Sequence, residues 1–393
     1  MKKMLILNGS HSDIRLIEEA KYMGYYTITL GNRPELIGHR YADEYISVDF
    51  SDKDAVYQIA KVQKVDAICA CANDFGALSA AYAAEKLGLK GHDKYETALI
   101  LHHKDKFKAF AKKNKIKTPL ADSFDNVYDA LLKKNEYEYP VIVKPIDLTG
   151  GKGVTRVNNP NEYELAIRRA FDLSKAKKII VESFIEGTYH SFSTFLVNKK
   201  VRAYFSDNEY SYLNPFLVTT SAHPATGIDY VEKILIQEAE KIAQLLNLVD
   251  GVFHMQYIMK EKKPYIIEIT RRCSGDWYCE PVEHAINQNW AKWIVMSEAG
   301  LDCSKIPQSV PLKNVFCGRH CIMGDKNGKV KDIYFSPEIQ KNIYKSFLWW
   351  KPDYEITNYM VDKLGILFLE YETEEEMLDK SNRITDLIKV IYT

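Results

Sequence analysis

The N-terminal part of the chain alternates short apolar runs with amphipathic segments, and this order constrains the fold more than any other feature. Apolar runs at 4–8, 26–30, 45–48 and 67–71 alternate with helix-like segments at 12–23, 53–64 and 75–87. Strand, helix and strand in this order form a parallel sheet covered on both faces. Asn8 and Gly9 follow the first strand, at the carboxyl edge where open sheets of this kind bind ligands. We therefore predict an α/β domain over 1–100.

Two further parts follow this domain. The pattern over 101–305 contains strands and helices in two α+β lobes, which we place at about 120–186 and 187–305. From 306 to 393 the pattern predicts a small β-rich α+β domain that ends in a helix over 373–390. The predicted fold class is therefore α/β and α+β in three domains, because the strand and helix patterns change along the chain.

The composition restricts the partners and the compartment. Lysine and arginine (53 residues) balance aspartate and glutamate (53 residues), so no net field attracts nucleic acid or an anionic membrane. The first apolar run ends at Asn8, which is too short for a signal-peptide core or a membrane span. Seven scattered cysteines without a paired spacing indicate reduced thiols. We predict a cytoplasmic protein that binds no nucleic acid and no membrane.

A lysine and a glycine-rich turn follow the strand at 141–143. Lys144 supplies a point charge at the strand end, and Gly150, Gly151 and Gly153 let successive backbone N–H groups approach phosphate oxygens. The turn Gly-Gly-Lys-Gly, with Lys152, is also typical of an exposed hairpin. Its position beside Lys144 favours a phosphate site.

The segment after the strand at 178–182 has the features of a purine-binding linker. Glu182 ends the strand, and Ser183 and Ile185 precede the glycine turn at Gly187. Backbone groups and a carboxylate can pair with a purine amino group while apolar side chains cover the ring. A plain strand end with a solvated acidic face is the alternative.

The strand at 264–270 ends in residues suited to a metal and a phosphate. Strand alternation places Glu268, Thr270 and Arg272 on one face and Arg271 on the other. Magnesium prefers hard oxygen ligands and keeps substrate phosphates in its coordination shell, so one carboxylate is enough to begin such a site. The alternative is a surface Glu–Arg pair of little energetic weight.

Taken together and in this order, these segments resemble the ATP-grasp superfamily, and the similarity covers nearly the whole chain. The N-terminal domain looks like the one that precedes the grasp in biotin carboxylase and the purine-pathway carboxylate–amine ligases. The resemblance implies an ATP-grasp domain over 101–305, with ATP and Mg2+ as cofactors. By position it implies these roles: phosphate binding for Lys104 and Lys144, a lid for Gly150, Gly151, Lys152 and Gly153, nucleotide contacts for Glu182, Ser183 and Ile185, magnesium binding for Glu268, and catalysis for Arg272 together with Lys144.

Three positions depart from the pattern of the family that the chain resembles. An acidic residue commonly stands twelve positions before the metal glutamate, and here that position holds Gln256, whose carbonyl oxygen is still a potential ligand. Thr270 stands where asparagine is usual, and its hydroxyl can also bind the metal or its water. Tyr189 occupies a position that is often acidic and binds ribose. Gln256 and Thr270 are therefore weaker candidate metal ligands than Glu268.

The combination predicts a ligase that activates a small-molecule carboxylate as an acyl phosphate and joins it to an amine. Candidate substrate residues are Asn8, Gly9, His254, Arg271 and Asp276. A regulatory nucleotide binder with a degenerate metal site is the alternative, because Gln256 is neutral. A dinucleotide-dependent oxidoreductase ranks last, since the chain lacks the glycine fingerprint after its first strand. The aromatic pair Trp349–Trp350 belongs either to the core or to the face of a homodimer.

Overall fold

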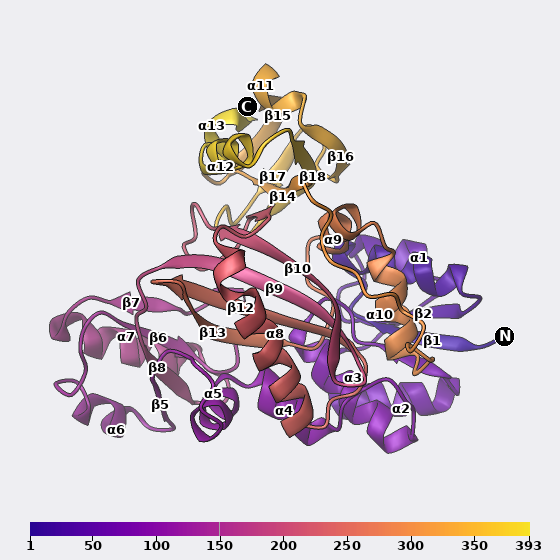
Figure 1. Cartoon of the computed structure of the whole chain (residues 1–393), viewed down its shortest axis with the longest axis horizontal. Helices are drawn as coiled ribbons and strands as arrows, with labels where there is room; N and C mark the ends of the chain where they lie inside the picture. The colour runs from indigo at the N-terminus through magenta and orange to yellow at the C-terminus, as the bar shows by residue number, and fades with distance from the viewer. Residues whose placement is uncertain (149) are drawn as a thin grey trace.

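A computed structural model describes residues 1–148 and 150–393, and Thr149 lies outside them. The described residues form four sheets. Figure 1 shows the N-terminal sheet on one side of a large central sheet, a small lobe on the other side, and the C-terminal strands above both. The predicted fold class, α/β and α+β in this order, is confirmed.

The N-terminal sheet is parallel, as the alternation of strands and helices predicts. Its strands are β1 (Lys3–Leu7), β2 (Tyr26–Gly31), β3 (Glu44–Ser47) and β4 (Ala67–Cys69), in the order β3-β2-β1-β4. The helical segments are η1 (His11–Asp13), α1 (Ile14–Tyr22), η2 (Ile37–Tyr41), α2 (Lys53–Gln63) and α3 (Asp74–Leu87). Helices α4 (Tyr95–His102) and α5 (Lys104–Lys113) lead out of this domain. The turn after β1 lies at the carboxyl edge of the sheet.

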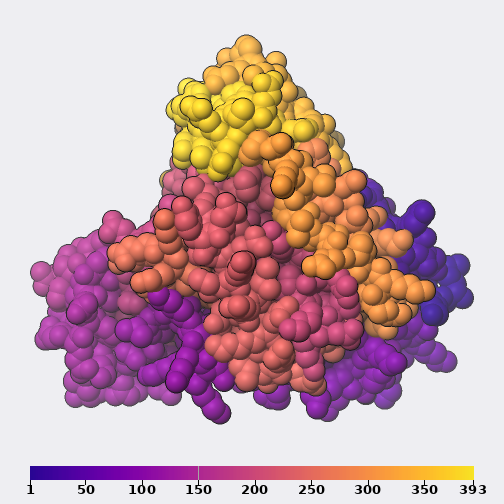
Figure 2. All heavy atoms as spheres, in the orientation of Figure 1, coloured from indigo at the N-terminus to yellow at the C-terminus, as the bar shows by residue number. Residues whose placement is uncertain are grey.

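A small antiparallel sheet forms the lid lobe, the lobe predicted at about 120–186. Its strands are β5 (Ala121–Phe124), β6 (Val141–Pro145), β7 (Thr155–Val157) and β8 (Ile179–Ser183), in the order β5-β8-β6-β7. Helices α6 (Val127–Leu132) and α7 (Pro160–Leu173) carry buried residues into the same core. In the space-filling view this lobe projects from the central body, on the side away from the N-terminal domain (Figure 2).

Eight strands form the central sheet. They are β9 (Thr188–Val197), β10 (Lys200–Tyr210), β11 (Thr220–His223), β12 (Gly251–Lys260), β13 (Lys263–Thr270), β14 (Phe316–Met323), β16 (Ile343–Leu348) and β18 (Lys363–Tyr371), in the order β13-β12-β9-β10-β11-β14-β18-β16. Helix α8 (Ile228–Leu245) packs its buried side chains against β9, β12 and β13. Because side chains alternate across each strand, the opposite face carries a second set of buried side chains, with Phe195 and Phe205 among them.

The C-terminal part contributes to two sheets. Strands β14, β16 and β18 extend the central sheet, so no sheet boundary coincides with residue 305. Strands β15 (Gly328–Phe335), β17 (Tyr354–Ile356) and β19 (Ile388–Tyr392) form a separate sheet, with helices α11 (Pro337–Gln340), α12 (Glu374–Asn382) and α13 (Ile384–Leu387) beside it. The predicted helix over 373–390 is wrong at its end, because the last residues pair with β15. Tertiary strand pairing overrides helical periodicity there.

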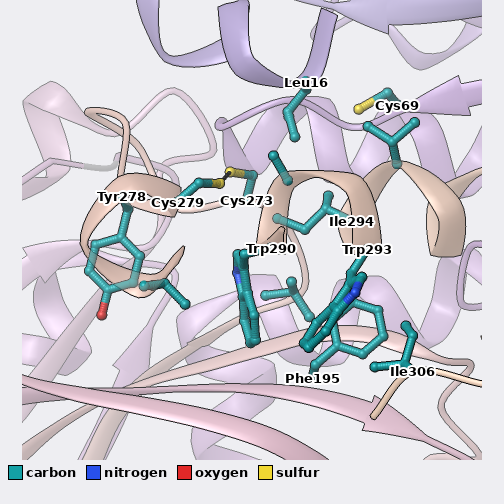
Figure 3. Close-up of a cluster of buried hydrophobic side chains, with 14 of the residues drawn as sticks. Leu16, Cys69, Phe195, Cys273, Tyr278, Cys279, Trp290, Trp293, Ile294 and Ile306 are labelled. Carbon is teal, nitrogen blue, oxygen red and sulfur yellow. Dashed lines mark hydrogen bonds between the residues drawn. The ribbon is translucent and has the colours of Figure 1, made fainter. Parts of the chain in front are cut away.

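A buried aromatic cluster joins the N-terminal domain to the central sheet. Helices α9 (Cys279–Ile286) and α10 (Trp290–Glu298) lie between them, with Leu16 on one side and Phe195 on the other (Figure 3). The Phe195 ring meets Trp290 and Trp293 edge-on, with centroids 5.7 and 5.6 Å apart. Burial of such large rings fixes the N-terminal domain against the sheet.

Two predictions from the sequence concern surface and thiol chemistry. All seven cysteines are buried and carry free thiols. Within the described part of the chain, no helix has both the length and the apolar character that a membrane crossing requires. Trp349 is half-buried, and its ring stacks on His11 with centroids 4.5 Å apart.

Candidate nucleotide and metal site

Two lysines converge on one buried carboxylate in the lid lobe. Lys144 at the end of β6 donates to Glu182 Oε2 on β8 over 2.9 Å, and Lys108 Nζ from α5 lies 3.5 Å from Glu182 Oε1. The side chains of Lys108 and Glu182 are only 5% and 4% exposed. Glu182 therefore fixes two cations side by side, whereas the sequence assigned it to the nucleotide base.

The electrostatics of this triad indicate room for a negative ligand. Burial lowers the pKa of Lys108 to about 8, although Glu182 acts against this change. Burial would raise the pKa of Glu182, but Lys108 and Lys144 hold it below its usual range. Within the described residues, Lys108 Nζ and Glu182 Oε1 are buried without a hydrogen-bond partner. Lys108 therefore forms an ion pair with Glu182 but no hydrogen bond, and a phosphate oxygen would supply the missing acceptor.

The glycine-rich turn adopts backbone angles that glycine favours. Gly150, Gly151 and Gly153 have φ of +65°, +73° and +72°, and a Cβ on Gly151 would collide with the backbone of Phe216. Lys152 is exposed. The turn thus lies close to the β10–β11 loop of the central sheet, across the space between the two lobes.

The remaining predicted nucleotide residues lie around the same space. Lys104 donates to the carbonyl oxygen of Leu148 over 2.8 Å, next to the glycine-rich turn. Ser183 Oγ accepts from the Leu120 N–H over 3.0 Å, so its side chain holds β8 to the preceding segment. Ile185 is half-buried in the linker between β8 and β9. Tyr189 follows at the start of β9 and is 40% exposed.

Glu268 and Gln256 are direct neighbours across β13 and β12. They are paired in the strand register, so their side chains point to the same face. Gln256 Nε2 donates to both carboxylate oxygens of Glu209 on β10, each over 2.9 Å. Thr270, two residues after Glu268, has a buried hydroxyl for which the described residues supply no partner. Oxygen ligands for a hard cation are therefore gathered on one face of the sheet.

Two further acids stand on the same face of β10. Asp207 lies opposite Ser191, which in turn lies opposite Gln256. Burial raises the pKa of Asp207 to about 6, and burial together with Asp207 raises the pKa of Glu209 to about 8. Glu268 adds to the rise at Glu209. Arg319 acts in the opposite direction on both pKa values, and a bound cation would lower them further.

Arg272 is held by the N-terminal domain. Its Nε and Nη2 atoms donate to the two carboxylate oxygens of Asp74 over 3.0 Å each, and His102 lies 3.2 Å from the same carboxylate. Burial would raise the pKa of Asp74, but Arg272 and His102 hold it well below its usual range. A planar guanidinium in a two-point contact has a fixed orientation.

Asp276 is the point where three parts of the chain meet. Its carboxylate accepts from Lys363 over 2.6 Å, from Arg319 over 3.4 Å, and lies 3.2 Å from His11 Nε2. Burial would raise the pKa of Asp276, but Lys363, His11 and Arg319 hold it well below its usual range. These residues come from β18, β14 and the turn after β1.

The turn that holds the candidates Asn8 and Gly9 is built on Asp13. Asn8 Nδ2 and the Gly9 N–H donate to Asp13 Oδ2 over 3.2 and 3.1 Å, and the Ala72 N–H donates to Oδ1 over 2.9 Å. Asn8 and Gly9 have φ of +76° and +89°. The two residues shape the carboxyl edge of the sheet, and the next residues bring His11 to Asp276.

His254 lies on the face of Gln256, as strand alternation predicts. It is buried, and its Nδ1 lies 2.6 Å from Ser193 Oγ. Burial lowers the pKa of His254 to about 3, with Arg272 and Arg319 acting in the same direction. The imidazole is therefore neutral at physiological pH, and one ring nitrogen is already engaged.

Arg271 points away from the other candidates. Its Nε donates to Asp93 over 2.8 Å, and its two terminal nitrogens donate to the carbonyl oxygens of Val252 and Val249. Both charged side chains are under 8% exposed. Because Arg271 follows the face opposite to Arg272, it connects the N-terminal domain to β12 instead of facing Glu268.

We expect Arg271→Ala to lower the free energy of unfolding by about 3–5 kcal/mol, because it leaves the buried Asp93 carboxylate unpaired. Denaturant unfolding of the variant measures this change. The matched control is Arg168→Ala, whose partner Glu164 is exposed and whose loss should leave the unfolding midpoint unchanged. A stable Arg271 variant with a raised KM for one substrate would instead support the substrate role predicted from sequence.

Sequence reasoning assigned no role to four residues of this region: Asp74, Lys108, Glu209 and Arg319. The alternation Asp207-Asn208-Glu209 in a strand was a usable signal, because it places two acids on one face. Asp74 opens α3 and Lys108 lies within a lysine-rich helix, where neither residue type is unusual. Arg319 gives no local signal at all, since its partners are distant in sequence.

Comparison with known proteins identifies a domain of known type in this chain. Residues 102–276 match the family model described as an ATP-grasp domain. The formate-dependent phosphoribosylglycinamide formyltransferase of Prochlorococcus marinus subsp. pastoris is 25% identical over 303 residues, 73% of this chain and 74% of that protein. The chain spans only 26% of the carbamoyl phosphate synthase large chain of Campylobacter jejuni, at 22% identity over 70% of its own length.

Solved structures share the whole fold. Phosphoribosylglycinamide synthetase from Anaerococcus prevotii superposes with a TM-score of 0.77 at 24% identity, over 100% of both chains. The L-amino acid ligase from Bacillus licheniformis gives a TM-score of 0.81 at 18% identity, over 100% of this chain and 99% of that one. The match of residues 102–276 to the ATP-grasp domain model, together with this shared fold, confirms the resemblance drawn from the sequence.

The residues present fit the nucleotide and the metal that this family uses. The ammonium groups of Lys108, which has no hydrogen-bond partner among the described residues, and of Lys144 suit a triphosphate. The Thr270 hydroxyl beside Glu268, also without such a partner, suits a magnesium ion or its water. Both sets lie where the lid lobe faces the central sheet.

Proposed function

We propose that this protein is an ATP-dependent ligase that activates a small carboxylate as an acyl phosphate and joins it to an amine, with release of ADP and phosphate. The observation that carries the proposal is the pair of lysines held by Glu182, with the Glu268–Gln256 pair on the central sheet. Similarity to carbon–nitrogen ligases over most of the chain supports it.

In this proposal each group of residues has a separate task. Lys104, Lys108 and Lys144 bind the phosphates of ATP, which supplies the transferred phosphoryl group. Glu268, Gln256 and Thr270 would hold the magnesium ion that accompanies ATP. Arg272, oriented by Asp74, stabilises the negative charge that develops during transfer. The turn at 150–153 excludes water, because an acyl phosphate exposed to water would hydrolyse.

An amino acid or a similar small metabolite suits the surroundings of Asp276 and Asp207. Arg319 has a buried Nε, and Asp207 a buried Oδ2, for which the described residues supply no partner. A group with both a carboxylate and an ammonium would pair with such opposite charges. The L-amino acid ligase from Bacillus licheniformis has the same fold, but a similarity of 18% identity supports the fold and not the substrate. The proposal of an amino-acid substrate therefore rests on the charged groups of Arg319 and Asp207.

A nucleotide binder without turnover is the second candidate. The observation that favours it is that Gln256, at a predicted metal position, carries no charge. In addition, no group of three or more His, Cys, Asp or Glu residues in the described chain is arranged to hold a metal. Such a protein would bind ATP, and the nucleotide would raise its melting temperature without release of ADP.

Release of ADP and phosphate separates the two candidates. We expect the purified protein with ATP, magnesium and a pool of amino acids and small carboxylates to release both products only when the pool is present. Dividing the pool then identifies the substrates. A melting temperature that rises with ATP, combined with no release for any pool, would favour the nucleotide binder, and turnover gained by Gln256→Glu would strengthen that reading.

A further inference from the structure

We infer that Glu209 is a positioning residue of the magnesium site: it orients Gln256 and supplies the negative charge that position 256 lacks. This inference rests on the proposed function, because it concerns the metal that accompanies ATP. It assigns a task to a residue on β10, which lies two strands from β12 and three strands from the predicted metal strand β13.

The hydrogen bonds determine how the Gln256 amide is turned. An amide has one donating nitrogen and one accepting oxygen, and a carboxylate accepts. Nε2 is therefore the atom directed at Glu209, where it lies 2.9 Å from each carboxylate oxygen. This contact leaves Oε1 of Gln256 free as a metal ligand beside Glu268, its direct partner across the strands.

The strand order places the Glu209 carboxylate on the side of Gln256 that is opposite to Glu268. Strand β12 lies between β13, which carries Glu268, and β9, which is followed by β10 with Glu209. Gln256 therefore has Glu268 on one side and Glu209 on the other. Outer carboxylates that hydrogen-bond to metal ligands commonly orient them and strengthen binding by 10- to 100-fold.

The local environment does not explain Glu209 as an ordinary structural acid. Among the described residues, the side-chain carboxylate of Glu209 accepts side-chain hydrogen bonds from Gln256 alone and forms no ion pair within 4 Å. Asp207 points to the same face of β10, two residues before Glu209, so a bound cation would reduce the repulsion between the two carboxylates. The arrangement is consistent with a site that gains its cation from solution.

Binding of Mn2+ in the presence of ADP, followed by the electron paramagnetic resonance signal of free Mn2+, tests the inference without turnover. We expect Glu209→Gln to weaken Mn2+ binding by about tenfold or more, while ADP affinity measured in EDTA stays at the wild-type value. We expect the double variant Glu209→Gln, Gln256→Glu to bind Mn2+ with an affinity within about threefold of the wild-type value, because the negative charge has moved from position 209 to position 256 and has not been lost.

The control is Glu164→Gln, which removes an exposed carboxylate of the lid lobe and should leave Mn2+ binding unchanged. Wild-type Mn2+ affinity in Glu209→Gln would overturn the inference, as would a folded double variant that stays as weak as the single one. If the wild-type protein binds no Mn2+ with ADP, the proposed function fails instead, so the two failures are distinguishable.

Discussion

Replacing Lys144 by alanine should abolish measurable ADP formation, with a loss of turnover on the order of 10³-fold or more. Removal of a single preorganised group that stabilises transition-state charge commonly costs 10²- to 10³-fold. Lys144 also neutralises Glu182, with which it forms a 2.9 Å ion pair, so its removal leaves Lys108 shared between this carboxylate and the phosphates. Steady-state assays of ADP release measure the effect.

A second variant separates phosphate binding from stability. Lys144→Met keeps the apolar length of the side chain and leaves Glu182 paired with Lys108, so the melting temperature should change little while turnover stays lost. Lys200→Ala is the matched control, because it breaks an exposed lysine–glutamate pair far from the lid lobe and should keep full activity. Undiminished turnover in the Lys144 variant would remove its phosphate assignment.

Arg272→Ala should reduce both turnover and stability. We expect a loss of turnover of about 10²- to 10³-fold and a loss of about 3–5 kcal/mol in the free energy of unfolding, because Asp74 then keeps a buried charge without its main partner. Lysine cannot replace the two-point contact, so Arg272→Lys should recover stability better than turnover. Parallel ADP-release and denaturation experiments give both quantities.

The same pair predicts a pH dependence of stability. The pKa of Asp74 lies well below its usual range in the folded protein, although burial alone would raise it. Its contribution to stability is therefore complete above the unfolded pKa of about 3.9 and is lost as the pH falls below that value. Asp74→Asn should flatten this part of the stability profile. If Asp74→Asn leaves both turnover and the fall of stability at acidic pH unchanged, Asp74 does not position Arg272.

The order of elements along the chain was readable from the sequence because the signals are local. A parallel sheet follows from alternating strands and helices at 1–100, and its turn at Asn8 and Gly9 follows the first strand. Side-chain alternation predicted the shared face of Glu268 and Thr270, and the opposite face for Arg271. These properties depend on periods of two and 3.6 residues, which a window of sequence contains.

The chain end and the sheet boundaries were less predictable. Residues 388–392 have both helical neighbours and β-branched side chains, and pairing with β15 decides in favour of a strand. Likewise β14, β16 and β18 join the central sheet although they follow residue 305. Strand partners this distant in sequence leave no trace in local periodicity.

The sequence by itself was enough to choose the residues that we propose for the nucleotide site: the lysines, the glycine turn, and Glu268 and Arg272 at the end of β13 and just after it. Only the tertiary structure decided how their charges are balanced. It paired Lys144 and Lys108 with Glu182, Arg272 with Asp74, Asp276 with Lys363, and Gln256 with Glu209. Each pairing joins residues more than thirty positions apart, and burial gives it its strength, so neither spacing nor composition could reveal it.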